Sequence, residues 1–443
     1  MSSYNKKKIG FVVFVIIIVI VVVAVISTSK SDVGTSPPPS PPGDEGDEGD
    51  EGDSSMDSSQ IFSSPLSTEL NPNDVQIIDN GNPGGNSYWN PATQIEVGDN
   101  GCVFVAYRQF DSGAFGEGNV VVAARSPFDP EWSIYPVDQE IIIGQSSLPS
   151  ALAVSRGFEV CGTPTVALSS ELFKQLSVAT LVDTSDWVFS DVPQISAVTP
   201  VALASTNAGL FLCVPDISVK LYFMAGGEQE WTLIAEIETL PGVTVSLAVY
   251  GSYVFVSYMN GRELNLVQIN YVDDNEGNVG FEQVELLREE MDLYFSPSTA
   301  PLLAADQYGV VVGAVSQGSN IHLWEIDLMF EGRDTYSFLP ILSKVSPIDA
   351  SLNISETEVI VSIISSANRN DPRSESFGFV VAKHNRAFRV NSQSKWDLHP
   401  VDLPGFHASI SSALQPGTNE LWVSLMETGF NQLAELIVVN LTV

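Results

Sequence analysis

The stretch ATQIEVGDNGCVFVAY, residues 92–107, decides the fold of this chain. It holds two runs rich in β-branched and aromatic residues, 92–97 and 102–107, on either side of a Gly-Asp-Asn-Gly tetrapeptide. Glycine and asparagine favour a tight hairpin turn, because they accept the positive backbone angle φ that such a turn needs. The stretch therefore predicts two antiparallel strands joined by a short turn.

The same arrangement recurs seven times between Pro91 and Val443, and each repeat opens on an apolar stretch with Ser, Thr or Pro. The openings follow one another at intervals of roughly 46 to 60 residues, the period of a four-stranded propeller blade. Within the first repeat, residues 92–97, 102–107, 120–125 and 132–137 are predicted to form strands a, b, c and d, from the inner to the outer edge of the blade. The openings are Asn90-Pro91-Ala92, Leu148-Pro149-Ser150, Val198-Thr199-Pro200, Val243-Thr244-Val245, Thr299-Ala300-Pro301, Ser346-Pro347-Ile348 and Phe406-His407-Ala408.

The later repeats contain the same strand candidates, and no long helical periodicity competes with them. An aromatic residue opens strand d in most repeats, at Trp132, Trp187, Trp231, Phe281, Tyr336 and Trp396. Strand b is predicted at 165–168, 210–214, 253–258, 310–315, 359–363 and 421–425. Strand c is predicted at 176–181, 219–223, 264–269, 321–326, 377–382 and 433–439.

The seventh repeat ends after its strand c, and residues 74–79 form a β-rich run before the first repeat with no other place in the pattern. A ring of blades must protect its strand edges, and a blade shared by both ends of the chain does so. We therefore expect an all-β fold, a seven-bladed β-propeller over 74–443, in which residues 74–79 are the outer strand of the last blade.

These repeats resemble the seven-bladed β-propeller superfamily at the level of the fold. The segment 126–132, Ser-Pro-Phe-Asp-Pro-Glu-Trp, is similar to the Ser-x-Asp-x-Gly-x-Thr-Trp box of sialidase-like propellers, but it lacks the glycine and its spacing differs. The Trp-Asp ending of WD40 blades is absent from the predicted strands c. The resemblance therefore implies a fold and names no family below the superfamily.

The first residues predict a membrane anchor. Ile9–Ile26 is apolar apart from Gly10 and spans about 27 Å as a helix, close to the thickness of a bilayer core. Lys6, Lys7 and Lys8 precede it, so the positive-inside bias leaves residues 1–8 in the cytoplasm. The alternative is a signal peptide cleaved near residues 27–29. Both interpretations export the rest of the chain.

Residues 27–73 have the composition of a disordered stalk. A proline-rich stretch, 35–42, favours extended polyproline II, and repeated Gly, Asp and Glu at 43–53 keep the chain flexible and self-repelling. Such a composition cannot form a packed core. We expect a spacer between membrane and propeller. The alternative, a calcium-binding acidic repeat, lacks a defined loop geometry.

Charge and cysteine content restrict the partners. The formal net charge is −35, and the residues after 73 keep about −29 of it. Such a surface repels phosphate backbones, so nucleic acid is not an expected partner, although the charge also serves solubility. Three cysteines, at 102, 161 and 213, do not suggest a disulfide framework. Cys102 and Cys213 are expected to be buried thiols in β-runs.

A ligand site is predicted where the b–c and d–a loops meet around the central channel. The two long b–c loops, 108–119 and 364–376, belong to blades that flank the seventh in a closed ring. Aromatic, arginine and carboxylate side chains suit a sugar or peptide ligand, although long loops are also tolerated as insertions without function. The candidate ligand-binding residues are Tyr88, Trp89, Arg108, Asp111, Glu117, Arg369 and Arg373.

Catalysis has weaker support. A sialidase-type mechanism would recruit Arg108, Arg369 and Arg373 with a tyrosine nucleophile, and a glycosidase would use a pair such as Asp111 and Glu117. The four histidines are not spaced as the ligands of a metal ion. Residues 273–278 superficially suggest a calcium loop, but an ordinary c–d turn is the preferred interpretation. We therefore expect no metal and no cofactor, and leave catalytic residues unassigned.

Two glycosylation sequons, at Asn353 and Asn440, lie in the exported part, and Asn353 is expected in a turn between strands a and b. Together these features predict a single-pass type II membrane glycoprotein. Its extracytoplasmic propeller, at a cell surface, in an organelle lumen or on a virion envelope, would bind a glycan or protein. The alternatives are an exported glycoside hydrolase of sialidase type and a structural envelope or surface protein.

Overall fold

The computed structural model contains one compact unit, Gln60–Val443, that holds every described strand. The predicted anchor Ile9–Ile26 and the stalk up to residue 71 lie outside the described residues. The described residues contain no helix with the length and apolar character that crossing a membrane requires. The structure describes residues 72–79, 93–98, 100–110, 118–137, 147–155, 161–170, 175–182, 186–193, 201–240, 243–273, 279–290, 300–315, 320–328, 334–340, 346–366, 379–386, 396–401, 403, 407–427 and 435–443.

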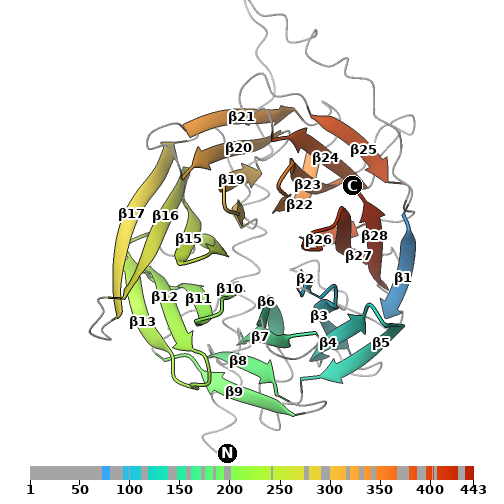
Figure 1. The fold of residues 1–443 in the computed structure, drawn as a ribbon, viewed down its shortest axis with the longest axis horizontal. Coiled ribbons are helices and arrows are strands. Elements are labelled where there is room, and N and C mark those ends of the chain that lie inside the picture. The colour runs from blue at the N-terminus through green and yellow to red at the C-terminus, as the bar shows by residue number, and fades with distance from the viewer. Residues whose placement is uncertain are drawn as a thin grey trace, which may run out of the picture. The chain divides into compact units, whose positions relative to one another are not determined.

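The described strands form seven antiparallel sheets of four strands each, arranged as blades around a ring (Figure 1). Blade 1 contains β2 (Gln94–Val97), β3 (Val103–Phe110), β4 (Gly118–Ser126) and β5 (Asp129–Pro136). Blade 2 contains β6 (Ser147–Ser155), β7 (Thr163–Ser170), β8 (Gln175–Leu181) and β9 (Trp187–Asp191). Blade 3 contains β10 (Ala202–Ser205), β11 (Gly209–Pro215), β12 (Val219–Ala225) and β13 (Thr232–Ile237). Blade 4 contains β14 (Thr244–Tyr250), β15 (Tyr253–Asn260), β16 (Glu263–Asp273) and β17 (Val279–Glu290).

The remaining blades complete the ring. Blade 5 contains β18 (Leu302–Ala305), β19 (Gly309–Val315), β20 (Asn320–Asp327) and β21 (Asp334–Pro340). Blade 6 contains β22 (Ser346–Ile354), β23 (Glu358–Ser366), β24 (Phe379–Asn385) and β25 (Asp397–Val401). Blade 7 contains β26 (His407–Leu414), β27 (Glu420–Glu427), β28 (Glu435–Thr442) and β1 (Asp74–Asp79). The predicted all-β, seven-bladed propeller is therefore confirmed.

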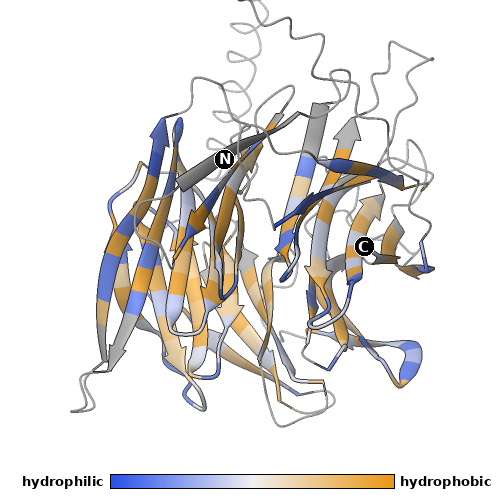
Figure 2. Ribbon diagram, turned by 45° about the horizontal axis from the view of Figure 1, so that its top comes forward, coloured by the Kyte–Doolittle hydropathy of each residue, from blue (hydrophilic) through white to orange (hydrophobic). Residues whose placement is uncertain are grey.

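The hydrophobic core lies between the blades. Seven clusters of buried side chains occur, and each combines residues of two neighbouring blades. Figure 2 shows apolar positions running through the middle of the strands, with polar positions more frequent at strand ends and in turns. Each inner strand also contacts the inner strand of the next blade, and β26 contacts β2. Burial on both faces of every blade thus explains the long apolar runs of the central strands.

Strand β1 closes the ring as predicted, by pairing with β28 at the outer edge of blade 7 (Figure 1). Its register places Asp74 opposite Asn440 and Ile77 opposite Ile437. Side chains also join β1 to blade 1. Asp74 pairs with Arg125 at 3.1 Å, and the Trp132 indole donates a hydrogen bond to the side-chain oxygen of Gln76.

The b–c loops of blades 1 and 6 are shorter than predicted. Strand β3 continues to Phe110 and β4 starts at Gly118, with Arg108 opposite Val120, so the connection is 111–117 instead of 108–119. In blade 6, β23 continues to Ser366 and β24 starts at Phe379, so residues 364–366 are strand. The hydrogen bonds between backbones continue whether or not the side chains are apolar. For this reason, the apolar runs of the sequence predicted b strands that end too early.

The expectation of a free thiol at Cys102 is wrong. Cys102 and Cys161 form a disulfide with a Cα–Cα distance of 5.2 Å across the a–b turns of blades 1 and 2. Each cysteine lies just before strand b of its blade, and adjacent blades bring these equivalent positions together, which the residue count did not reveal. Cys213 is free and buried, as expected.

Breaking the disulfide is expected to destabilise the domain. The bridge joins residues 59 positions apart, and closing a loop of this length contributes about 4 kcal/mol by restricting the unfolded chain. Cys161→Ser should therefore lower the melting temperature, and reductant should lower that of the natural protein to a similar value. If reductant lowers the melting temperature of the Cys161→Ser variant as well, the effect does not come from this bridge.

Candidate functional site

The strands of a blade alternate in direction, so the propeller has two different faces. The b–c turns and the d–a connections lie on one face, called here the b–c face. The a–b and c–d turns lie on the opposite face, called here the a–b face. The residues predicted to bind a ligand belong, by their position in the repeats, to the b–c face.

Most of the predicted ligand residues are not among those that the structure describes. Arg108 lies in β3, two residues before the end that leads to the b–c face. The others lie in the d–a connection before blade 1 or in the b–c connections of blades 1 and 6, outside the described residues. They are Tyr88, Trp89, Asp111, Glu117, Arg369 and Arg373. The patch that they would form stays a prediction.

Blades 3 and 4 provide the best described part of the b–c face. Two large aliphatic side chains are exposed there: Ile217 is 64% exposed, in the b–c turn of blade 3, and Leu240 is 60% exposed, in the connection from blade 3 to blade 4. The Leu240 backbone N–H donates to Oδ1 of Asn260 at 3.0 Å. The connection is thereby tied to the end of β15.

Ion pairs organise the polar side chains of this region. Lys220 Nζ lies 3.0 Å from Oδ2 of the buried Asp216. Burial acts to lower the pKa of Lys220, but the hydrogen bond to Asp216 and its charge raise that pKa above its ordinary value. In blade 4, Arg288 Nη2 lies 3.1 Å from Glu263 Oε1. Both cations are therefore held close to carboxylates.

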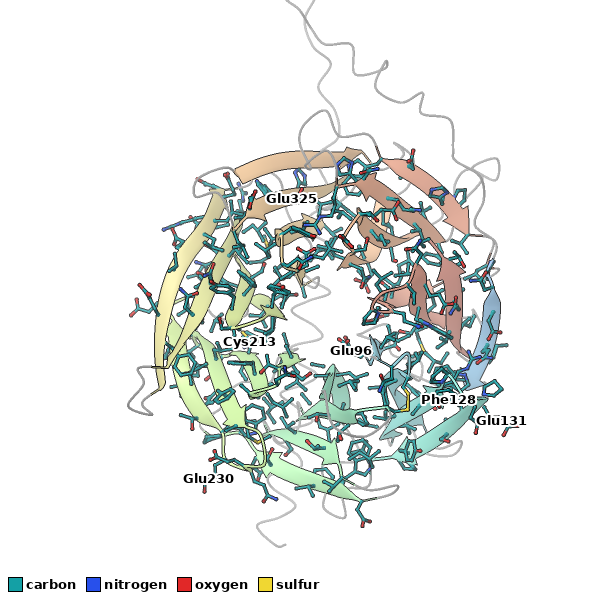
Figure 3. The ribbon with its side chains drawn as sticks, viewed as in Figure 1. Glu96, Phe128, Glu131, Cys213, Glu230 and Glu325 are labelled. Carbon is teal, nitrogen blue, oxygen red and sulfur yellow. A yellow bond between two sulfur atoms is a disulfide. The ribbon has the colours of Figure 1, made fainter. Side chains whose placement is uncertain are left out.

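The inner strand of blade 1 places a carboxyl group at the central channel. Gln94 and Glu96 alternate in β2 with Ile95 and Val97, and Ile95 is buried between blades 7 and 1. Figure 3 shows Glu96 at the inner edge of the ring. Burial raises the pKa of Glu96 to about 7, and no hydrogen bond or ion pair to its carboxylate forms among the described residues. The sequence signal was this alternation of polar and apolar residues in an inner strand.

Replacing Glu96 is expected to change how stability depends on pH. Its folded-state pKa of about 7 lies above the ordinary 4.5, so the stability of the natural protein falls as pH rises between these values. Glu96→Gln removes the titration and should gain up to about 3 kcal/mol relative to the natural protein by pH 8, and little at pH 4.5. Melting curves over this range test it, with the exposed Glu282→Gln as control. A gain that is equal at pH 4.5 and pH 8 would contradict the assignment.

Polar side chains of the inner strands also join blades 6 and 7. The Asp349 carboxylate accepts the backbone N–H of Ile410 at 3.1 Å and that of Ala350 at 3.0 Å. Burial raises the pKa of Asp349 to about 6 although these hydrogen bonds act to lower it. Asn353 Nδ2 donates to Ser412 Oγ at 2.7 Å. Asn353 therefore lies in strand β22 and not in the turn where the sequence placed it.

The a–b face contains a buried ionic cluster that sequence reasoning missed. Arg386, after β24 of blade 6, pairs with Asp306 in the a–b turn of blade 5 and, at 3.4 Å, with Glu325 of β20. Its guanidinium donates to the backbone oxygen of Ser355 at 2.8 Å and lies 5.7 Å from the centre of the Tyr308 ring. We call these residues the Arg386 clamp.

A repeated turn motif was the available signal for this clamp. The first residue of the a–b turn is Thr206 in blade 3, Asp306 in blade 5 and Ser355 in blade 6. In each turn its side-chain oxygen accepts backbone N–H groups two and three residues further on. Aligning the repeats on this motif would have placed Asp306 and Ser355 in neighbouring turns, facing the same junction between blades.

No group of three or more His, Cys, Asp or Glu side chains suited to a metal ion occurs among the described residues. His322 is buried in β20, and burial lowers its pKa. His384 is buried against the ring of Trp396, with 5.2 Å between the ring centres. These two histidines are part of the packing between strands.

Comparison with known proteins assigns the chain to no family. No protein-family model and no curated protein matches the chain. A protein of unknown function from Dyadobacter fermentans DSM 18053 aligns at a TM-score of 0.42 with 10% identity, over 83% of this chain and 99% of its own. The β-propeller domain of the Trilobed protease from Pyrococcus furiosus, described as having an open velcro topology, aligns at 0.44 with 9% identity, over 78% and 94%.

A third solved structure is the subtype N11 neuraminidase-like protein of A/flat-faced bat/Peru/033/2010. It aligns at a TM-score of 0.39 with 10% identity, over 67% of this chain and 90% of its own. Likenesses of this size carry no argument about this chain. They assign neither ligand nor activity to this chain.

Proposed function

We propose that this seven-bladed propeller is an exported recognition domain, held at a membrane by Ile9–Ile26, that binds a glycan or protein partner through its b–c face. One observation carries the proposal: Ile217 and Leu240 are more than half exposed on that face. Most other aliphatic side chains described in blades 3 and 4 are buried between blades, and Leu233 and Val284 of the outer strands are less exposed, at 44% and 38%. Exposing aliphatic groups to water is unfavourable in free energy, and such groups are a typical feature of interaction surfaces.

Export is supported by the Cys102–Cys161 disulfide, because such bonds form and persist in oxidising compartments. The predicted orientation leaves residues 1–8 in the cytoplasm and the propeller outside it, with residues 27–73 as the spacer. On this proposal, the domain lies at a cell surface, in an organelle lumen or on a virion envelope.

The two sequons differ in accessibility. Asn353 is half-buried and bonded to Ser412, whereas Asn440 is 6% exposed and its side chain bonds those of Asn73 and Glu420. A glycan on either residue would have to be added before the domain folds. We propose Asn353 as the better acceptor of the two.

A second candidate function is an exported glycoside hydrolase, which a single observation favours: the pKa of Glu96 is raised to about 7, a value typical of a general acid. Glu96 lies in β2 close to the a–b turn, so it belongs to the other end of the channel from the predicted arginines. This separation favours recognition over hydrolysis.

A glycan array beside a panel of chromogenic glycosides tests the proposal and its rival together. We expect the protein to bind a defined set of glycans, or cells bearing a protein partner, without turnover. Arg369→Ala with Arg373→Ala should weaken glycan binding at least tenfold. Turnover that Glu96→Gln abolishes would establish the hydrolase instead, and absence of binding to glycans and to cells would contradict a recognition function.

A further inference from the structure

We propose that the b–c face of blades 3 and 4 is a docking surface for a basic polypeptide segment that carries apolar side chains among its lysines or arginines. This inference rests on the proposed recognition function and specifies where it occurs and what it recognises. The surface, called here the blade 3–4 surface, consists of Ile217 and Leu240 with the carboxylates Glu236, Glu238, Glu263, Glu289 and Glu290.

The apolar part of the blade 3–4 surface is fixed by short, well-bonded turns. Ile217 is in the middle of a turn closed by the Asp216 N–H and the Ser218 carbonyl oxygen at 2.9 Å. The Ile217 side chain is 64% exposed, so most of its apolar surface is in contact with water. Because the turn is already ordered, an apolar partner would contact Ile217 without a large loss of conformational entropy.

Leu240 is held in a similar way by the neighbouring blade. Its backbone is bonded to Asn260, and its Cδ1 lies 3.9 Å from the position that a Cβ would occupy on Gly261. The leucine therefore lies over the b–c turn of blade 4, at van der Waals distance from Gly261, whose φ of 67° is one that glycine adopts readily. The two exposed aliphatic groups belong to adjacent blades on the same face.

Carboxylates surround these two side chains. Glu236 and Glu238 are exposed at the end of β13, and Glu289 and Glu290 are exposed at the end of β17. The strand register places Glu290 opposite Glu263. Three cations lie nearby: Lys220 pairs with Asp216, Arg288 pairs with Glu263, and Arg262 is exposed in the b–c turn of blade 4. Asp216 and the five glutamates of the surface outnumber them. The surface therefore presents an excess of negative charge around an apolar centre.

This charge selects the class of occupant. The domain has a net charge of about −29, so a second copy of it, an anionic lipid surface or the acidic stalk would be repelled. A neutral sugar binds best against aromatic rings, and the apolar centre here is aliphatic. A segment with lysine or arginine beside leucine-like side chains complements both parts of the surface.

The test uses the full-length protein in detergent and two labelled peptides of equal length and charge, one alternating Lys with Leu and one alternating Lys with Ser. Fluorescence anisotropy at physiological salt gives the affinities. We expect the Lys-Leu peptide to bind at least tenfold more tightly than the Lys-Ser peptide. Ile217→Ser with Leu240→Ser should remove that difference.

A matched control lies on the opposite face. Val182, in the c–d turn of blade 2, is 57% exposed, so Val182→Ser removes a similar aliphatic group from the a–b face and should leave the affinities unchanged. Glu236→Gln with Glu238→Gln should lower the affinity for both peptides at least threefold and reduce the salt dependence of their binding. The proposal would be overturned if Val182→Ser and the double serine variant lost equal affinity for the Lys-Leu peptide. It would also be overturned if the natural protein showed no preference for that peptide.

The failure of this inference is distinguishable from the failure of the recognition function. If the protein binds cells or glycans and the double serine variant does so equally, recognition occurs elsewhere on the b–c face and the blade 3–4 surface is not its site. If the peptide preference is present while neither cells nor glycans are bound, the docking surface stands and the broader proposal is wrong.

Discussion

Deleting residues 74–79 is expected to destabilise the propeller by several kcal/mol and to make it aggregate, whereas deleting 27–70 should leave the melting temperature unchanged. Without β1, strand β28 becomes an unpaired outer edge. The deletion also removes Ile78 from the core between blades 7 and 1. The Arg125 and Trp132 side chains lose Asp74 and Gln76 as partners.

Melting and light scattering of the two deletion variants, beside the natural protein, measure this difference. A third variant, Val75→Ser with Ile77→Ser, is the control. These side chains are 47% and 55% exposed, so their loss keeps the backbone pairing of β1 and should cost far less stability than the deletion. Equal melting temperatures for the two deletions would contradict closure of the ring by β1.

Replacing Arg386 by methionine is expected to lower the free energy of unfolding by about 3 to 5 kcal/mol, because breaking a buried ion pair leaves uncompensated charge. The Arg386 side chain is 5% exposed and that of Glu325 is 9% exposed. Both Asp306 and Glu325 would keep their positions in blade 5 without the cation. The junction between blades 5 and 6 should therefore open at a lower temperature or denaturant concentration.

Arg288→Met provides the matched control for this substitution. The Arg288 side chain is 59% exposed in its pair with Glu263, and exposed pairs contribute at most about 1 kcal/mol. Adding Asp306→Asn and Glu325→Gln to Arg386→Met removes the excess charge and should restore part of the lost stability. Urea unfolding of the four proteins measures these differences. A loss for Arg386→Met no larger than that for Arg288→Met would show that the Arg386 clamp does not hold the blades together.

The blade pattern was predictable because it repeats. Hydrophobic runs of strand length and turn residues recur along the chain, so the strand order and the role of 74–79 followed from the sequence, and Asp74–Asp79 is the strand that pairs with β28. Contacts between blades were not predictable in the same way. The Cys102–Cys161 bond and the Arg386 clamp join residues of different repeats. Their partners depend on the rotation from one blade to the next, which hydropathy does not encode.

The candidate site was predictable only as a face. Repeat position assigned Tyr88, Trp89, Arg369 and Arg373 to the b–c face, but whether loop side chains converge depends on backbone paths that turn propensity does not fix. The exposed Ile217 had a visible signal, an isoleucine between Asp216 and Ser218 in a three-residue turn.

The central claim is that recognition occurs on the b–c face, and a steric block at single sites tests it most directly. Ile217→Cys and Val182→Cys place one reactive thiol on each face. The natural cysteines do not interfere, because Cys102 and Cys161 are bonded and burial of Cys213 raises its thiol pKa.

Each variant, in its full-length form on liposomes, is biotinylated at the new thiol, loaded with streptavidin, and assayed for adhesion to a panel of cells. We predict that streptavidin at position 217 abolishes adhesion, whereas streptavidin at position 182 leaves it unchanged. Loss of adhesion from position 182 alone, or adhesion that survives both blocks, would contradict recognition by the b–c face.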